Sequence, residues 1–111
     1  MKIGKITLNG RSGNIYLANY AIEHVAKKYA KELEQIGISA ESYVKLIIRE
    51  YTEVREAKTN SKNRYLLVVS KHLSNVAIVD FIYKDGEYQV VTAYPIKMDK
   101  IKDLKIVKHK K

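Results

Sequence analysis

Apolar residues at steps of three and four predict two helices in the first half of the chain. The first series begins after Asn19, a residue type that favours helix N-termini, and continues to about Gln35. Its apolar positions are Ile22, Val25, Tyr29, Leu33 and Ile36. Gly37 suits the left-handed conformation that ends a helix, and Ser39 can cap a second helix that runs through Tyr51.

Alternation of apolar and polar residues predicts β-hairpins on both sides of these helices. In residues 1–18 the alternation surrounds an Asn-Gly pair and a second glycine, which favours a hairpin with a loop of several residues. After the helices, the strand-like runs 54–58 and 64–71 are separated by a polar loop and predict a second hairpin. The second strand of that pair is apolar enough to be central in a sheet.

The last predicted hairpin has the strongest local signal, an Asp-Gly pair at 85–86 between the runs 76–83 and 87–94. A two-residue turn there sets Val79 opposite Thr92, on the face that is the better candidate for packing against the helices. We therefore expect Thr92 at the end of the last strand, on its helix-facing side. The following proline cannot donate to a strand ladder and ends this strand.

Together these elements predict an α+β domain. Two N-terminal helices pack on a four-stranded antiparallel meander sheet, and a short β-hairpin precedes them. At 111 residues the chain suits a single domain with one core. Its predicted segments are a hairpin at 1–18, two helices at 19–51, the sheet at 52–97 and a basic C-terminal segment at 98–111, which forms either a short strand or a helix.

Composition narrows the class of protein. Apolar residues make up 46% and charged residues 30% of the chain, which is typical of a folded globular domain. No apolar run reaches the length of a bilayer span and the first residues do not resemble a signal peptide, so we expect a cytoplasmic protein without a membrane partner. With no cysteine and three scattered histidines, the sequence predicts neither a metal site nor a cofactor.

The net charge of +9 points to a polyanionic partner such as nucleic acid or an anionic membrane surface. Residues 100–111 hold six lysines against one aspartate, so more than half of the excess is at the C-terminus. This segment is either a phosphate-contacting element or a solubilising tail that frays into solvent.

The order of the predicted helices and strands, together with two short motifs, is similar to that of one group of proteins. The chain has Glu23-His24-Val25 at the start of a helix, then a second helix, then four strands of which the last ends in VVTAYP, residues 90–95. This order resembles the metal-independent ribonucleases that unite barnase, EndoU, colicin-type tRNases and RelE-like toxins, especially their phage-borne branches. The resemblance covers residues 15–97 and rests on short motifs. It implies cleavage of RNA by attack of its own 2′-hydroxyl on the adjacent phosphate.

The resemblance also implies roles for particular residues. His24 corresponds to the helical acid or base and Thr92 to a hydroxyl presented to phosphate, while Tyr94 donates to phosphate or stacks on a base. Such a reaction needs fixed positive charge around the phosphate. The residues expected to supply it are Lys28, Lys31, Arg55, Arg64 and Lys71. The expected partners are RNA and, for a toxin, an antitoxin or immunity protein.

Each of these residues also has a structural interpretation. His24 falls on the polar side of its helix, where it forms a basic ridge with Lys28 and Lys31, and such a ridge is commonly a solvated face. Thr92 suits a half-buried strand by propensity alone, and Tyr94 can close a strand end. On the basis of the resemblance, the leading hypothesis is a toxin- or phage-type endoribonuclease. The alternatives are a non-catalytic basic nucleic-acid-binding domain and a protein-interaction module that uses a sheet edge.

Overall fold

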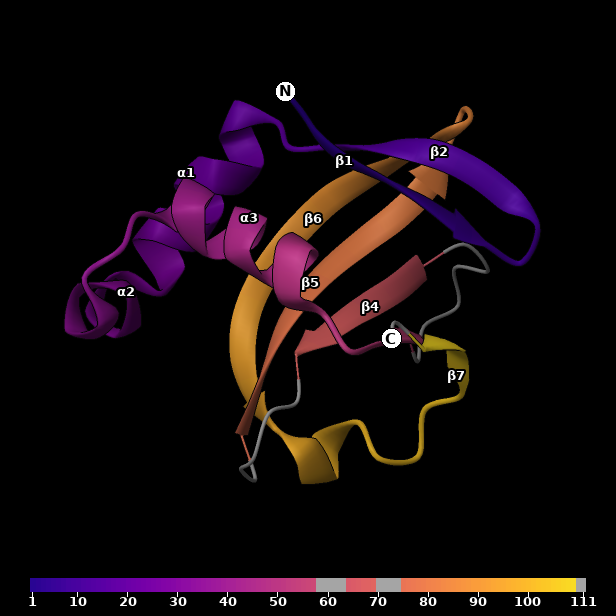
Figure 1. Ribbon diagram of the computed structural model, residues 1–111. Coiled ribbons are helices and arrows are strands. Elements are labelled where there is room, and N and C mark those ends of the chain that lie inside the picture. The colour runs from indigo at the N-terminus through magenta and orange to yellow at the C-terminus, as the bar shows by residue number, and fades with distance from the viewer. Residues whose placement is uncertain (58–63, 70–74, 110–111) are drawn as a thin grey trace.

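The structure is a computed structural model that describes residues 1–57, 64–69 and 75–109. Within these residues the chain forms three α-helices, a short 3₁₀-helix and seven strands, arranged as in Figure 1. In chain order these elements are β1 (Lys2–Leu8), β2 (Arg11–Tyr16), α1 (Asn19–Lys28), α2 (Ala30–Ile36), α3 (Ala40–Glu50), β3 (Glu53–Glu56), β4 (Arg64–Val69), β5 (Asn75–Lys84), β6 (Glu87–Lys97), η1 (Met98–Lys100) and β7 (Ile106–His109).

All seven strands form one mixed sheet in the order β1-β2-β6-β5-β4-β3-β7. The pairing of β2 with β6 is parallel and every other pairing is antiparallel. The sheet curls, so that Lys108 on β7 donates a hydrogen bond from its Nζ to the carbonyl of Thr7 on β1 over 3.4 Å. The predicted four-stranded antiparallel meander with two helices is therefore wrong. Strands from both ends of the chain extend the sheet, because its outer strands offer unpaired backbone groups.

The N-terminal hairpin is tighter than predicted. Asn9 and Gly10 both have positive φ, 51° and 79°, which is the conformation of a two-residue type I′ turn. The predicted loop of several residues is thus a turn of two, and Gly13 lies within β2. A Cβ atom at Gly13 would lie 2.7 Å from the carbonyl oxygen of Gly86, so glycine allows the hairpin to approach the β5–β6 turn.

Only some of the predicted helix caps are found in the structure. Gly37 adopts the left-handed conformation after α2, and Ser39 accepts a hydrogen bond from the backbone of Ser42 at the start of α3, as predicted. The predicted single helix from 19 to 35 is broken at Tyr29, which separates α1 from α2. Asn19 is not the N-cap, because that position is Ala18.

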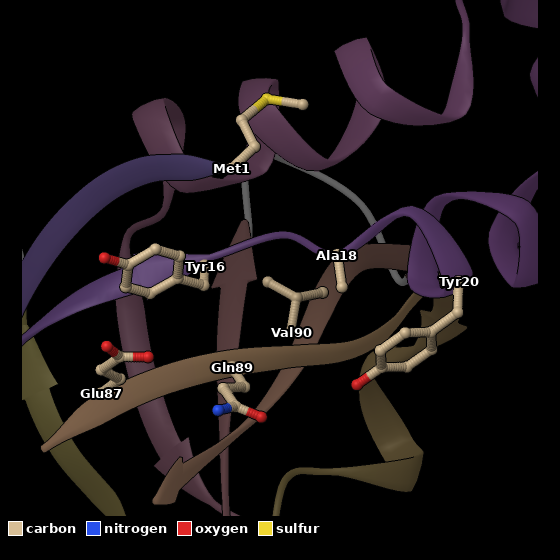
Figure 2. Close-up of a pocket in the computed structure, with 7 residues that line it drawn as sticks. All are labelled: Met1, Tyr16, Ala18, Tyr20, Glu87, Gln89 and Val90. Atoms are coloured by element: carbon tan, nitrogen blue, oxygen red, sulfur yellow. The ribbon is translucent and has the colours of Figure 1, made fainter. Parts of the chain in front are cut away.

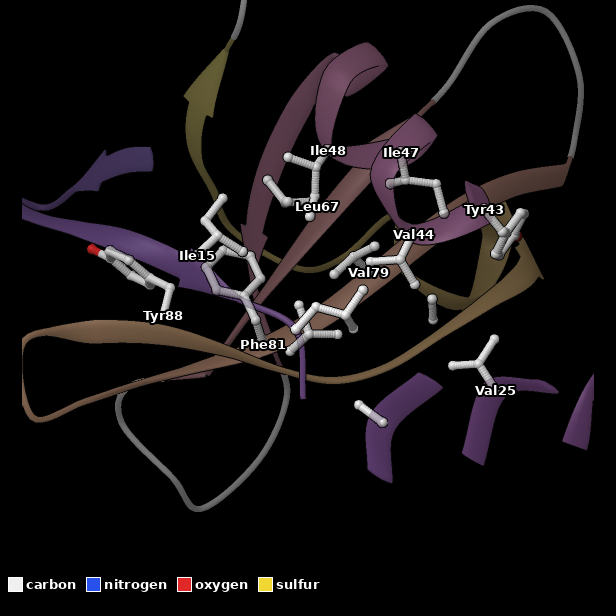
Figure 3. Close-up of a cluster of buried hydrophobic side chains, with 14 of the residues drawn as sticks. Ile15, Val25, Tyr43, Val44, Ile47, Ile48, Leu67, Val79, Phe81 and Tyr88 are labelled. Carbon is white, nitrogen blue, oxygen red and sulfur yellow. The ribbon is translucent and has the colours of Figure 1, made fainter. Parts of the chain in front are cut away.

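The main core lies between the helices and one face of the sheet. Tyr43, Val44, Ile47 and Ile48 form the buried side of α3. Figure 3 shows these side chains directed toward the sheet, where Leu67 is among the buried residues that meet them. Burial of each such side chain stabilises the fold by roughly 1.5–3 kcal/mol. We call this side of the sheet the helix face and the other side the open face.

A β-bulge in β6 changes which face the predicted site residues occupy. Phe81 pairs with Val90, but Val91 is then skipped and Asp80, not the predicted Val79, lies opposite Thr92. Because side chains alternate along a strand, this extra residue moves Thr92 from the helix face to the open face. Thr92 on the helix-facing side was therefore a wrong prediction.

The basic C-terminal segment is part of the fold. After η1 the chain buries Ile101, which is 3% exposed, in a second small core on the open face. β7 then pairs with β3, so the interpretation as a tail that frays into solvent does not hold for residues 98–109. The undecided choice between strand and helix is resolved as a 3₁₀ turn followed by a short strand.

Candidate functional site

The open face carries a cleft of about 340 Å³ between the strands and the C-terminal segment. We call it the η1 cleft. Its apolar floor and wall are formed by Ala57, Leu66, Ile96, Ile101 and Leu104. Its polar groups come from Arg64 on β4, Asp80 on β5, Tyr94 on β6 and Lys100 on η1. The cleft thus combines an apolar surface with a small set of polar groups, as ligand sites commonly do.

Strand register places these side chains together. Leu66 pairs with Arg55 on one side and with Asp80 on the other, and Asp80 pairs with Thr92. Residues directly opposite in neighbouring strands share a face of the sheet. The four residues therefore form one row across the open face, and Arg64 lies in the next row.

Arg64 and Asp80 form a bidentate ion pair. The Nε and Nη2 atoms of Arg64 donate to the two carboxylate oxygens of Asp80, each over 2.9 Å. The hydrogen bond to Asp80 raises the pKa of Arg64. Because a paired guanidinium already has an anionic partner, Arg64 adds little net charge to the cleft. Lys100 is the cleft cation that forms no ion pair within the described part of the chain.

Tyr94 keeps its proton at neutral pH. Burial raises the pKa of Tyr94, the negative charge of Asp80 raises it further, and Arg64 opposes these effects. Tyr94 also stacks on Tyr29 with ring centroids 6.3 Å apart, and Lys28 Nζ lies 5.7 Å from the Tyr29 ring centroid. The tyrosine stack therefore connects one predicted phosphate-binding lysine to the edge of the cleft.

The hydroxyl of Thr92 is buried and makes no hydrogen bond within the described residues. Leaving a buried hydroxyl unpaired costs about 1–3 kcal/mol. In this conformation the side chain contributes shape but no polar contact. A phosphate can reach the hydroxyl only if the surrounding residues move.

Arg55, a predicted phosphate clamp, is 7% exposed and bonds to other groups of the protein. It pairs with the carboxylate of Glu53. Its Nη1 donates to the backbone carbonyls of Ile101, Lys102 and Leu104, over 3.0, 3.1 and 3.2 Å. The side chain therefore holds the C-terminal turn in place, and its guanidinium is not presented to a ligand.

The other predicted residues lie apart from the cleft lining. His24 is exposed on α1, where it makes no hydrogen bond or ion pair within the described residues. Lys31 is exposed on α2, so the break at Tyr29 interrupts the continuous helical ridge predicted for it with His24 and Lys28. Lys71 lies outside the described residues.

Four lysines between residues 97 and 105 are exposed, and one of them, Lys100, lines the cleft. They are Lys97, Lys100, Lys102 and Lys105. None of them has a carboxylate within ion-pair distance among residues 1–57, 64–69 and 75–109. Asp99 and Asp103 are the acidic residues of the same segment, so positive charge remains in excess. The charge of the C-terminus was evident from the sequence, but its position next to Arg64 and Tyr94 was not.

Two further findings concern metal ions and membranes. In the part of the chain that the structure describes, no three histidine or acidic side chains are arranged to hold a metal ion. None of the described helices combines the length and the apolar character needed to cross a membrane.

Comparisons with protein-family models, with curated proteins and with solved structures gave no significant match for this chain.

Proposed function

We propose that this chain binds single-stranded RNA through the exposed lysines of residues 97–105 and the adjoining η1 cleft. The observation that carries the proposal is a set of exposed lysines that form no ion pair within the described residues, one of which, Lys100, lines a partly apolar cleft. Lysines that are not neutralised by neighbouring carboxylates can replace the counterions of RNA phosphates.

The anchoring of this segment supports the proposal. Arg55 donates to three backbone carbonyls of the turn, and Ile101 is buried beneath it. Lysines on an ordered turn lose less backbone freedom on binding than lysines on a frayed tail. The backbone positions of these lysines are therefore set before RNA binds.

The cleft favours single strands over a duplex. Its apolar wall and the half-buried ring of Tyr94 suit an unstacked base, whereas paired bases expose only their edges and backbone. Aromatic contacts of this kind are tolerant of sequence, so the proposal concerns a class of nucleic acid and not one site.

Binding can be tested with two variants of equal charge. Lys100→Gln/Lys102→Gln removes two exposed cations of the C-terminal segment, and Lys27→Gln/Lys45→Gln removes two from the helices. Affinity for a labelled single-stranded RNA is measured by fluorescence anisotropy at several salt concentrations. Each phosphate contact contributes about 0.7 to the magnitude of the negative slope of log K against log salt. Lys100→Gln/Lys102→Gln should therefore reduce the magnitude of that slope by about 1.4.

The control variant should leave the slope close to that of the unmodified protein. Equal effects of the two variants would show that only net charge matters and would refute the assignment to residues 97–105. Absence of RNA binding by the unmodified protein at low salt would refute the proposed function altogether.

Metal-independent cleavage of RNA is a second candidate, in line with the resemblance to ribonucleases. One observation favours it: the Tyr94 hydroxyl lies in the same cleft as Arg64 and Lys100, so a proton donor and cations are near one another. The reaction also needs a base, and His24 is not among the cleft lining. An acidic antitoxin or immunity protein would compete with RNA for the same lysines.

Cleavage is tested by incubating the protein with total RNA and tRNA in the presence of EDTA, followed by end-group analysis. Products that end in 2′,3′-cyclic phosphate would support the enzyme. Binding without any product would leave the protein as a non-catalytic RNA-binding domain.

A further inference from the structure

A second pocket lies at the other end of β6, between β2, β6 and the first turn of α1 (Figure 2). We call it the tyrosine pocket. It has a volume of about 220 Å³, and its main side chains are Tyr16, Tyr20, Glu87 and Gln89. Ala18 and Val90 add apolar surface. None of these residues belongs to the η1 cleft.

Two aromatic rings from different elements border this pocket. Figure 2 shows the ring of Tyr16 on one side and that of Tyr20 on the other, with Gln89 and Val90 between them. Tyr20 is 64% exposed, so most of its side-chain surface is accessible to a ligand. Exposed rings of this kind are the usual stacking surfaces for the bases of single-stranded nucleic acid.

The polar side chains of the pocket complement the edge of a base. The amide of Gln89 can donate and accept, and the carboxylate of Glu87 only accepts. Neither side chain has a hydrogen bond or ion pair within the described residues, although Glu87 lies opposite Lys84 in the β5–β6 hairpin. A carboxylate acceptor favours bases that carry an exocyclic amino group, as cytosine does and uracil does not.

Register connects the tyrosine pocket to the η1 cleft. Tyr16 pairs with Gln89, Gln89 with Ile82, and Ile82 with Arg64, so these residues form one row across the open face. Neighbouring strands are about 4.8 Å apart, which puts Arg64 roughly 10 Å from Gln89. An RNA strand with one base in the tyrosine pocket therefore has its backbone within a few nucleotides of Arg64 and Lys100.

We propose that the tyrosine pocket binds one base of single-stranded RNA and prefers a base with an exocyclic amino group. The ring of Tyr20 stacks on the base, while Gln89 and Glu87 contact its edge. This inference rests on the proposed RNA binding, and it supplies the base contact that the lysines lack, because phosphate contacts position a strand without reading it.

The test compares labelled oligocytidine and oligouridine of equal length by fluorescence anisotropy at one salt concentration. Oligocytidine should bind more tightly to the unmodified protein. Tyr20→Ala should weaken binding roughly 5- to 150-fold, the range that stacking of one base contributes. Tyr20→Phe should retain the affinity because it keeps the ring. Glu87→Gln should reduce the difference between the two oligomers. Ile36→Ala removes another exposed apolar side chain, on α2, and should change nothing.

The outcomes separate this inference from the proposed function. Equal affinity of Tyr20→Ala and unmodified protein, or equal binding of the two oligomers, would overturn the base pocket even if salt-dependent RNA binding persists. If the unmodified protein does not bind RNA at low salt, both the proposed function and the base pocket are overturned.

Discussion

Replacing Arg55 with methionine should destabilise the protein strongly and loosen its C-terminal segment first. The guanidinium donates to the carbonyls of Ile101, Lys102 and Leu104 and pairs with the largely buried carboxylate of Glu53. Methionine fills much of the same volume but donates nothing. Arg55→Met therefore tests polar satisfaction with little change in packing.

The expected loss follows from the burial of the pair. The side chains of Arg55 and Glu53 are 9% and 12% exposed, so removing the cation leaves a carboxylate with little access to water. Breaking a buried ion pair in this way costs about 3–5 kcal/mol. The three carbonyls partly regain water when the turn opens, so we expect a loss of about 3 kcal/mol, a large part of the roughly 5–15 kcal/mol typical of a domain.

Urea unfolding followed by circular dichroism measures this free energy. Arg49→Met is the matched control, because Arg49 pairs with Glu50 on the surface of α3 and its side chain is 73% exposed. Surface pairs contribute only about 0–1 kcal/mol. The double variant Glu53→Gln/Arg55→Met should lose less than Arg55→Met alone, since no buried charge is left unpaired. A loss for Arg55→Met no greater than for Arg49→Met would refute the anchoring role.

Two further predictions concern Thr92 and Tyr43. Thr92→Val should keep the free energy of unfolding or raise it by up to about 1 kcal/mol, because the hydroxyl makes no hydrogen bond within the described residues. A large loss of RNA cleavage with unchanged RNA binding would instead give that hydroxyl the catalytic role. For Tyr43, burial raises the pKa from 10.0 to about 12. The folded protein holds this proton more tightly than the unfolded chain does, so the resulting stability is complete below pH 10.0 and is lost as the pH rises toward about 12. Tyr43→Phe should reduce that loss in urea titrations across this range, and an unchanged pH profile would contradict the assignment.

The parts of the fold that could be predicted are those set by neighbouring residues. The Asp-Gly pair at 85–86 fixes a two-residue turn, and Gly37 and Ser39 mark a helix end and a helix start. The parallel pairing of β2 with β6 could not be found in this way, because it depends on which strand edges meet across most of the chain. The bulge at Val91 was equally hidden, since every residue around it suits a regular strand.

The residues of the candidate site also divide into those that the local sequence predicts and those that it does not. Arg64 and Tyr94 line one cleft, yet this cleft is on the open face, whereas the predicted register put Thr92, two residues before Tyr94, on the helix-facing side. Asp80 was overlooked, although an aspartate inside the apolar run 76–83 is a signal, because a buried carboxylate in a strand needs a cationic partner. Nothing local distinguishes Arg55, which holds a turn, from Arg64 at the cleft.

The pairing of β2 with β6 also constrains how the chain acquires its structure. Residues 15 and 88 lie side by side in the finished sheet, and so do residues 53 and 109 at its other end. Contacts between such distant residues form slowly, because a long loop must close before they gain any stability. On the ribosome the N-terminal hairpin is made early but has no strand to join until β6 has emerged. The outer strands of the sheet are therefore expected to be the last to assemble, and the unpaired hairpin is the segment most exposed to wrong partners during synthesis.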